Sequence, residues 1–302
     1  MRVALLVTVM FIVLSLLLAT PLGCSQPSLP ATIIDDMGRA VSINEIPERI
    51  VSHVPPITEI VFALGLGDKV VGVSDYCDYP GEAKLKPSVG NYYNPSIENI
   101  VALNPDLVLT DGHSESIKQL DSLGITYLVI DPKDIDGIFH DIELLGKVTG
   151  VEGRAEKLIK DMRERVAQVM ARVKDAPRPK VFYIIDATDL NNPWTAGPGS
   201  FVDSLIAMAG GQNIVQAQGA WLQYNVEQVV SSDPEIIILP AEHGTAFTSP
   251  EVLREHPAWR EISAVKLNKI YIIEGDLVDG YGPRLVQGLE EIAKLIHPEL
   301  FK

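Results

Sequence analysis

The chain of 302 residues is poor in basic residues and nearly free of cysteine. Its 25 Lys and Arg residues face 40 Asp and Glu residues, which gives a formal net charge of −15. No basic stripe is present that would neutralise nucleic-acid phosphates, so the composition argues against a nucleic-acid partner. The same acidity disfavours electrostatic docking on anionic lipid.

Motifs for catalysis and for metal binding are also missing. The segment "DGHSES" at 111–116 lacks the closing Gly of the G-x-S-x-G nucleophile elbow. The segments "GLGDKV" and "GPGSFV" each lack the third Gly of a dinucleotide fingerprint. No spacing resembles a zinc site. We therefore predict that the protein is not an enzyme and uses no catalytic cofactor and no metal of its own. Turnover that is lost in Ser114→Ala would contradict this.

The N-terminus contains the longest apolar run. Arg2 precedes an uncharged run from Val3 to about Leu18, and small residues follow up to Gly23. A basic start, an apolar core and small residues are typical of a secretory signal, so we expect a signal peptide over residues 1–23. An uncleaved anchor of marginal spanning length is the alternative. Either way, the protein is expected to work outside the cytoplasm.

Gly23 and the following Cys24 resemble the lipobox of bacterial lipoproteins. The resemblance implies that Cys24 is acylated and that residues 24–30 form a lipid-anchored tether. Pro21 departs from the pattern, because Leu is expected three residues before the cysteine. If Cys24 is acylated, Cys77 is the only remaining thiol and no internal disulfide can form.

Two halves of the chain repeat each other. The phrase "IENIVALNPDLVLT" at 97–110 returns as "VEQVVSSDPEIIILP" at 226–240, and residues 58–73 align without gaps to 202–217. A repeat with so long a period indicates duplicated domains and not a solenoid. We expect an N-terminal lobe over 31–137 and a C-terminal lobe over 177–302.

Each half alternates strands and helices. The runs "RIVSHV" and "KVFYIID" are short, apolar and rich in β-branched residues, which is typical of strands covered on both faces. "TEIVFALG" has the pattern of a helix that ends at Gly65. The predicted fold class is α/β, with two Rossmann-like lobes related by internal duplication. Their ligand edge should lie at the carboxyl ends of the strands.

A long amphipathic helix is predicted between the halves. Apolar residues from Leu158 to Val173 follow three-and-four spacing, and charged residues fill the opposite face. The helix should run from Glu152 to Lys174, a length of about 35 Å, and end before Pro177. Within a linker region at 138–176, it would join the lobes as one stiff backbone helix.

The segment "GVSDYCDYPGEA" at 72–83 carries the most specific resemblance. With this segment, the two lobes and the single helix, the chain resembles class III substrate-binding proteins of ABC importers, and among them the cobalamin-binding receptors most. The resemblance implies a monomeric extracytoplasmic lipoprotein that captures a corrinoid, either vitamin B12 (cobalamin) or cobinamide, between its lobes. It would deliver this ligand to an ABC permease dimer with its ATPase subunits. A haem or iron-siderophore receptor on the same scaffold is the alternative.

The resemblance also implies a set of ligand contacts. Tyr76 matches a tyrosine that contacts the corrin, and Tyr92 or Tyr93 falls where an aromatic lines the cleft. A family arginine is absent, since Gly280 occupies its position, and whether Arg284 compensates stays open. The contacts implied in the second lobe are two aromatic residues and a residue at the polar rim of the ligand, namely Trp194, Trp221 and Asp276.

Two glutamates occupy equivalent positions in the repeated phrase. The resemblance implies that Glu98 and Glu227, one on each lobe, dock into arginine pockets of the permease. A two-fold symmetric partner needs two equivalent contact points. The alternative is a local role, because Ser96 and Asn225 have the pattern of N-caps and a Glu favours the positive end of a helix.

Three histidines follow predicted strands. His53, His113 and His243 all point toward the predicted cleft edge, where each could bind cobalt or iron axially. Ordinary polar surface residues are the alternative. His53 is the first candidate among them as a ligand contact.

Overall fold

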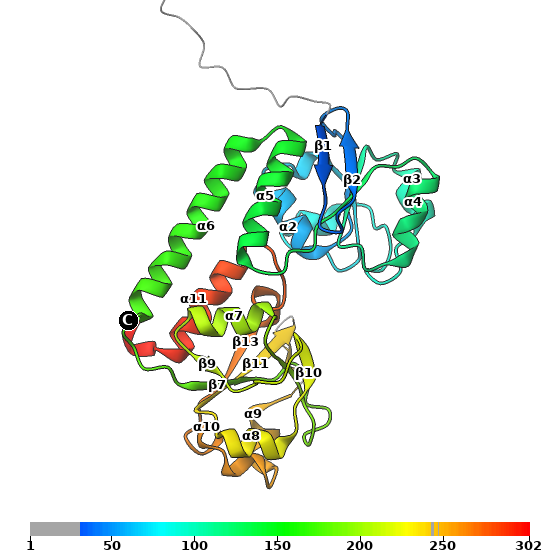
Figure 1. Ribbon diagram of the computed structural model, residues 1–302. Helices are drawn as coiled ribbons and strands as arrows, with labels where there is room; N and C mark the ends of the chain where they lie inside the picture. Colours follow the sequence, from blue (N-terminus) through cyan, green and yellow to red (C-terminus); the bar gives the residue numbers. More distant parts are fainter. Residues whose placement is uncertain (1–30, 243–244, 247) are drawn as a thin grey trace, which may run out of the picture.

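The computed structural model describes residues 31–242, 245–246 and 248–302. Two α/β lobes are stacked in Figure 1, with a pair of long helices along one side. The predicted signal peptide, the acylated Cys24, the tether and His243 lie outside the described residues. Within the described part of the chain, no helix has the length and apolar character needed to cross a bilayer.

The first lobe is built on a four-stranded parallel sheet. Its strands are β3 (Ile50–Ser52), β4 (Val70–Val73), β5 (Leu107–Thr110) and β6 (Tyr127–Val129), in the order β4-β3-β5-β6. Its helices are α2 (Pro55–Ala63), α3 (Ile97–Ala102) and α4 (Gln119–Ser122). An antiparallel hairpin of β1 (Ala31–Ile34) and β2 (Ala40–Ile43) precedes the sheet. As predicted, α2 stops ahead of Gly65, which adopts a left-handed φ of 69° that suits glycine.

The second lobe is built on a similar sheet. Its parallel strands are β7 (Lys180–Tyr183), β9 (Gln212–Asn213), β11 (Ile236–Glu242) and β13 (Ile270–Glu274), in the order β9-β7-β11-β13. The short strand β12 (Thr245–Ala246) pairs antiparallel with β11. The helices are α7 (Phe201–Met208), α8 (Val226–Ser232), α9 (Pro250–Glu255), α10 (Ser263–Lys266) and α11 (Leu285–Ile296). A separate antiparallel ribbon consists of β8 (Trp194–Ala196) and β10 (Trp221–Gln223).

The two sheets share one strand order. In each, the first parallel strand lies between the second and the third, and the fourth lies beyond the third. The repeated phrase of the sequence forms α3 and β5 in the first lobe and α8 and β11 in the second. The predicted α/β class with two similar lobes is therefore confirmed. The common order is what an internal duplication would produce, and the duplication itself stays an interpretation.

The long helix between the lobes is α6 (Glu152–Val173). Its 22 residues span about 33 Å and end before Pro177, as predicted. It forms a helical hairpin with α5 (Ile135–Thr149), which begins ahead of the expected linker boundary at residue 138. A Cβ on Gly146 would lie 2.4 Å from the Cβ of Ala155, so the glycine permits close packing of the two helices.

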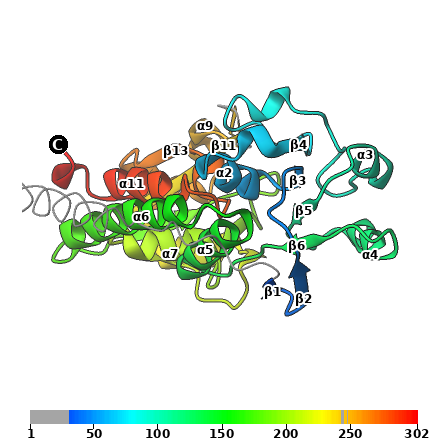
Figure 2. The same ribbon diagram turned by 90° about the horizontal axis from the view of Figure 1, so that it is seen from above.

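The helix α6 is packed against both lobes and is not an isolated tether. One continuous apolar core contains Ile57 of the first lobe, Met162 of α6 and Leu289 of the second lobe. Arg165 of α6 donates two hydrogen bonds to the Glu290 carboxylate of α11, at 2.8 and 2.9 Å. Figure 2 shows α5, α6, α7 and α11 lying along one another. This packing stiffens the connection between the lobes.

Candidate functional site

A cavity of about 410 Å³ lies between the lobes, where several parallel strands end. We call it the inter-lobe cavity. In the first lobe its lining follows β3, β4 and β5, and in the second lobe it follows β13. Ligands of α/β proteins bind at this edge because the loops leaving the strands gather there. The lining residues that carry the argument below are Glu59, Tyr76, Tyr79, Tyr92, Asp111, Asp276 and Arg284.

The first lobe supplies the aromatic wall. The ring of Tyr92 stacks on the imidazole of His53, with centroids 5.8 Å apart and planes inclined by 12°. Tyr93 meets Tyr92 edge to face at 4.8 Å and is 76% exposed. The hydroxyl of Tyr76 accepts a hydrogen bond from the Asn91 amide at 3.3 Å. Three predicted contacts, Tyr76, Tyr92 and Tyr93, thus lie together on the cavity wall.

The phenol of Tyr92 is held by a buried carboxylate. Its hydroxyl donates a hydrogen bond to Asp111, which directly follows β5. Burial raises the pKa of Tyr92 well above its usual range, and the Asp111 carboxylate raises it further. The hydroxyl therefore stays protonated, and the ring is fixed in place by contacts on its edge and on one face.

His53 lies behind this wall and does not line the cavity. Its side chain is fully buried, and its Nε2 lies 3.5 Å from the carbonyl oxygen of Asn91. Burial lowers the pKa of His53, so the imidazole is neutral near pH 7. In this geometry His53 supports Tyr92, and contact with a ligand stays a prediction. The exposed His113 lies 3.2 Å from Asp111 through its Nδ1 and is also outside the lining.

The second lobe supplies polar groups. Asp276 lies in a short 3-10 helix (Gly275–Leu277) after β13, and its carboxylate is 3.8 Å from the Arg284 guanidinium. Asp279 accepts a hydrogen bond from the Tyr183 hydroxyl at 2.7 Å. The Tyr281 hydroxyl reaches across to the first lobe and donates to the carbonyl of Ile130 at 3.3 Å. Asp276, a predicted contact, lines the cavity.

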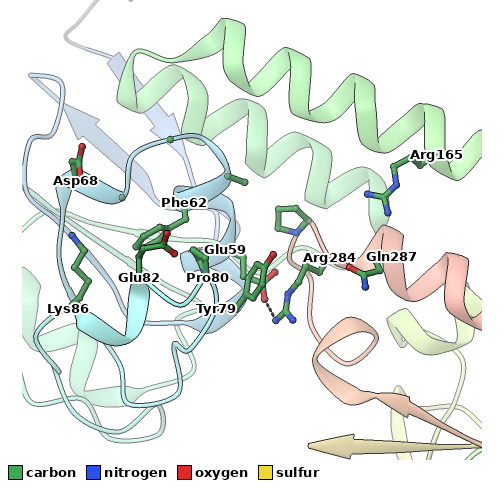
Figure 3. A pocket seen from close by; sticks show the side chains of 14 residues that line it. Glu59, Phe62, Asp68, Tyr79, Pro80, Glu82, Lys86, Arg165, Arg284 and Gln287 are labelled. Atoms are coloured by element: carbon green, nitrogen blue, oxygen red, sulfur yellow. Dashed lines mark hydrogen bonds and ion pairs between the residues drawn. The ribbon is translucent and has the colours of Figure 1, made fainter. Parts of the chain in front are cut away.

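A buried ion pair joins the lobes at the floor of the cavity. Arg284 donates to the Glu59 carboxylate of α2 at 2.6 Å, and its guanidinium lies 4.0 Å from the ring centre of Tyr79. Figure 3 shows these three side chains meeting between the lobes. Burial raises the pKa of Glu59, and the guanidinium opposes that shift. Arg284 is therefore committed to holding the lobes together.

A second, larger cavity of about 650 Å³ lies on the other side of this ion pair. Glu59, Tyr79 and Arg284 line both cavities, so they form the wall between them. The larger cavity is bounded by Arg165 of α6 and by the end of α2, as Figure 3 shows. Of these two cavities, only the smaller lies where the parallel strands end.

The two tryptophans lie on the β8–β10 ribbon. Trp194 pairs with Gln223 and Trp221 pairs with Ala196, so both rings are on the same face of the ribbon. They are 43% and 41% exposed, and neither is among the residues that line the inter-lobe cavity. A ligand that extends beyond the cavity could reach this face, and their role stays a prediction.

The two glutamates of the repeated phrase occupy equivalent places. Glu98 is the second residue of α3 and Glu227 the second residue of α8, and both are exposed. Ser96 and Asn225 cap these helices by accepting backbone N–H groups at 3.2 and 2.8 Å, so both predicted caps are confirmed. Neither glutamate forms an ion pair within the described part of the chain.

Some lining residues were not found from the sequence. Tyr79 lies within the quoted segment at 72–83, which was a usable signal, and it lines the cavity beside Tyr76. Asp111 follows a predicted strand and could have been found in the same way. Glu59 and Tyr281 carry no local signal, since one lies in a buried helix and the other reaches its partner across the lobes.

The free thiol of Cys77, in the segment at 72–83, is buried. Its sulfur lies 3.2 Å from the Thr58 hydroxyl and 3.3 Å from the Ser74 hydroxyl. Burial raises the pKa of the thiol, so it is a structural residue and not a nucleophile. In the described ranges, no group of three or more His, Cys, Asp or Glu side chains is arranged to hold a metal ion.

Comparison with known proteins places this chain and its fold in a family. Residues 50–277 match the periplasmic binding protein family, and the chain belongs to it. Its two α/β lobes on one long helix are those of class III substrate-binding proteins, the receptors of ABC transporters, which are not enzymes.

Individual relatives cover nearly the whole chain. The uncharacterized ABC transporter substrate-binding lipoprotein YvrC of Bacillus subtilis is 33% identical, over 93% of this chain and 94% of its own. The crystal structure of the periplasmic vitamin B12 binding protein BtuF of Vibrio cholerae is 27% identical, with a TM-score of 0.70 over 85% of this chain and 99% of its own. The periplasmic heme-binding protein RhuT of Roseiflexus sp. RS-1 is 27% identical, with a TM-score of 0.74 over 84% and 99%.

Proposed function

We propose that the protein is an extracytoplasmic receptor that captures a corrinoid, cobalamin or cobinamide, and delivers it to an ABC importer. The observation that carries the proposal is the inter-lobe cavity, with aromatic rings mainly on the wall of the first lobe and carboxylates from both lobes. Its shape and chemistry suit a broad, flat ligand with apolar faces and a polar rim. Similarity to a vitamin B12 binding protein supports the same ligand class.

The two walls recognise different parts of the ligand. Tyr76, Tyr79 and Tyr92 offer ring faces that bury the apolar surface of a macrocycle, each contributing roughly 1–3 kcal/mol when well covered. Asp276 on the opposite wall accepts hydrogen bonds from the amide N–H groups that surround a corrin. Trp194 and Trp221 extend the aromatic surface beyond the cavity toward the outer part of the ligand.

Anchoring and delivery complete the proposal. Acylation of Cys24 holds the receptor at the outer face of the cytoplasmic membrane as a monomer. Glu98 and Glu227, presented at the starts of equivalent helices, dock on the two halves of the permease dimer. Charge pairs at such a rim fix orientation and speed the encounter more than they add affinity.

Haem is the competing ligand, because the similar protein RhuT binds it. A tyrosine ligand to haem iron would have to act as a phenolate. The hydrogen bond from Tyr92 to Asp111 and the raised pKa of its phenol oppose that role. Tyr93 is exposed and would be the ligand if iron were bound here.

The ligand is tested by titrating the purified protein with cyanocobalamin, cobinamide and haemin. Dissociation constants come from the quenching of Trp194 and Trp221, and haem binding is read from a shift of the Soret band. We expect micromolar or tighter binding of a corrinoid and no specific Soret shift. Tight binding of haemin with no corrinoid bound would replace the proposal by the haem receptor.

Docking is tested with the double variant Glu98→Ala/Glu227→Ala. Corrinoid affinity should stay unchanged, because both residues lie outside the cavity lining, while transporter-dependent uptake falls by at least tenfold. The matched control is Glu156→Ala/Asp161→Ala, which removes two exposed charges from α6. Normal uptake by the first variant, or equal loss in the control, would remove the docking assignment.

A further inference from the structure

The lining of the inter-lobe cavity is strongly biased toward one sign of charge. From the described residues, five carboxylates and one guanidinium contribute to it. The carboxylates come from both lobes, and Asp276 and Asp279 are exposed to solvent. The charged lining residues are Glu59, Asp78, Asp111, Asp276, Asp279 and Arg284.

The one cation among the described lining residues is already paired with carboxylates. Arg284 donates to Glu59 at 2.6 Å and lies 3.8 Å from Asp276. Two further basic groups lie behind the lining: Lys84 is 3.6 Å from Asp78, and His113 is 3.2 Å from Asp111. Both side chains are mostly exposed and neither lines the cavity. A ligand in this cavity therefore meets more carboxylates than cations among the described lining residues.

Gly280 of the second lobe lies in the lining opposite Pro56 of the first lobe. A Cβ at this glycine would lie 3.2 Å from Cγ of Pro56 in the first lobe, which is tighter than ordinary van der Waals contact. A side chain at this position would require Pro56 to shift by a few tenths of an ångström. Glycine at this position contributes no charge to the lining.

We propose that this cavity selects its ligand by the charge of the ligand's rim. It favours a corrinoid that is cationic and fully amidated, as cobinamide is, over cobalamin, whose phosphodiester cancels the positive charge of the cobalt corrin. It discriminates most strongly against rims that carry carboxylates. The inference rests on the proposed function and names the preferred members of that ligand class.

The physical basis is that the carboxylates of the cavity attract hydrogen-bond donors on the ligand and repel its anionic groups. Amide N–H groups donate charge-assisted hydrogen bonds to carboxylates. A carboxylate or phosphate on the ligand can only accept hydrogen bonds, and it is repelled. In such partly screened surroundings, each added negative charge should weaken binding by roughly tenfold.

The test compares three corrinoids that share one ring. Aquocyanocobinamide, cyanocobalamin and a cobalamin monocarboxylic acid are titrated by calorimetry at low and at high ionic strength. We expect affinity to fall in that order by roughly tenfold per step, and the steps to shrink at high salt. Equal affinities at low salt, or tightest binding of the carboxylate, would overturn the charge selection. Failure of all three to bind would instead refute the corrinoid receptor itself.

A variant of Asp276 tests whether the carboxylates of the cavity cause the charge selection. The gap between cobinamide and the monocarboxylic acid is the ratio of their affinities. Asp276→Asn should reduce this ratio by roughly fivefold to tenfold. A residue with only a structural role would weaken all three ligands alike. The control Asp175→Asn removes an exposed charge after α6, away from the cavity, and should leave the gap unchanged. An unaltered gap in Asp276→Asn, or an equal change in the control, would contradict the proposal.

Discussion

The two lobes have the same sheet and present different surfaces to the ligand. The first lobe contributes rings at the ends of its strands, with Tyr92 fixed between His53 and Asp111. The second lobe contributes exposed carboxylates and the guanidinium of Arg284. A shared strand order therefore fixes where the loops gather, and the side chains on those loops decide what each lobe offers.

The helices away from the cavity behave differently. In both lobes, α3 and α8 begin with a capping side chain and place a glutamate at the second helical position. A symmetric partner would require this likeness, whereas an asymmetric ligand does not require similar walls. The lobes are alike at the proposed docking points and differ at the cavity.

The largest expected effect on stability concerns the ion pair of Glu59 and Arg284, which joins the two lobes. In Arg284→Met, the Glu59 carboxylate stays buried without its partner. The free energy of unfolding should fall by roughly 3–5 kcal/mol, as is usual for a broken buried ion pair. Urea denaturation at pH 7 measures it.

The double variant Glu59→Gln/Arg284→Met provides the control. It removes the uncompensated charge and should recover a large part of the loss. If the single and the double variant were equally unstable, the effect would come from the packing on Tyr79 and not from the buried charge.

The next effect concerns the pH dependence of stability that the buried carboxyl of Asp141 should cause. The carboxyl of Asp141 on α5 is 1% exposed and lies beside the carboxylate of Asp36. Burial, followed by the adjacent carboxylates of Asp36 and Asp131, raises the pKa of Asp141 to about 8. The folded protein therefore holds a proton that the unfolded chain releases near pH 4.

The stabilisation from this proton is complete below about pH 4 and is lost as the pH rises to about 8. In Asp141→Asn the amide replaces the protonated acid, so the variant should exceed the wild type by roughly 2–4 kcal/mol at pH 8.5 and by little at pH 4.5. Thermal unfolding over this pH range measures the difference. Asp136→Asn, at an exposed position of the same helix, should leave the pH dependence unchanged.

A smaller effect compares two tyrosine–aspartate hydrogen bonds, one in each lobe. Tyr92→Phe leaves the buried Asp111 without one donor and should cost roughly 1–3 kcal/mol of stability. Tyr183→Phe removes the hydrogen bond to the exposed Asp279 and should cost roughly 0.5–1.5 kcal/mol. Urea midpoints of the two variants, measured together, test this order. A larger loss in Tyr183→Phe would mean that the second lobe positions the cavity more than the first.

The smallest effect should be equal in the two lobes. Ser96→Ala and Asn225→Ala each remove one helix cap and should each cost about 1 kcal/mol. Denaturant unfolding measures both. A difference well above that amount would show that equivalent helices are held by different tertiary contacts, and would break the likeness of the docking points.

The sequence was sufficient for the frame of the molecule. The repeated phrase placed α3 with β5 and α8 with β11, since buried parallel strands give uninterrupted apolar runs. The three-and-four spacing from Leu158 to Val173 placed α6, because one side of that helix packs on the core. Both patterns are local, so they can be read without knowing the fold.

The site was only partly predictable. The segment at 72–83 led to the loop of Tyr76, while Glu59 and Arg284 meet across 225 positions and leave no local pattern. His53 was predicted at the cleft edge from its position after a strand; it is buried under Tyr92, and its contact with a ligand stays a prediction. Which side of a loop faces a cavity depends on packing between lobes, which a single segment does not encode.

Within the described residues, the chain passes from one lobe to the other once, along α6 and the segment at 174–179. Neither sheet borrows a strand from the opposite half. A break in the backbone after Ala176 would therefore leave every strand pairing intact. Two separately synthesised fragments, divided at that point, should associate through the apolar core that contains Ile57, Met162 and Leu289 and rebuild the receptor.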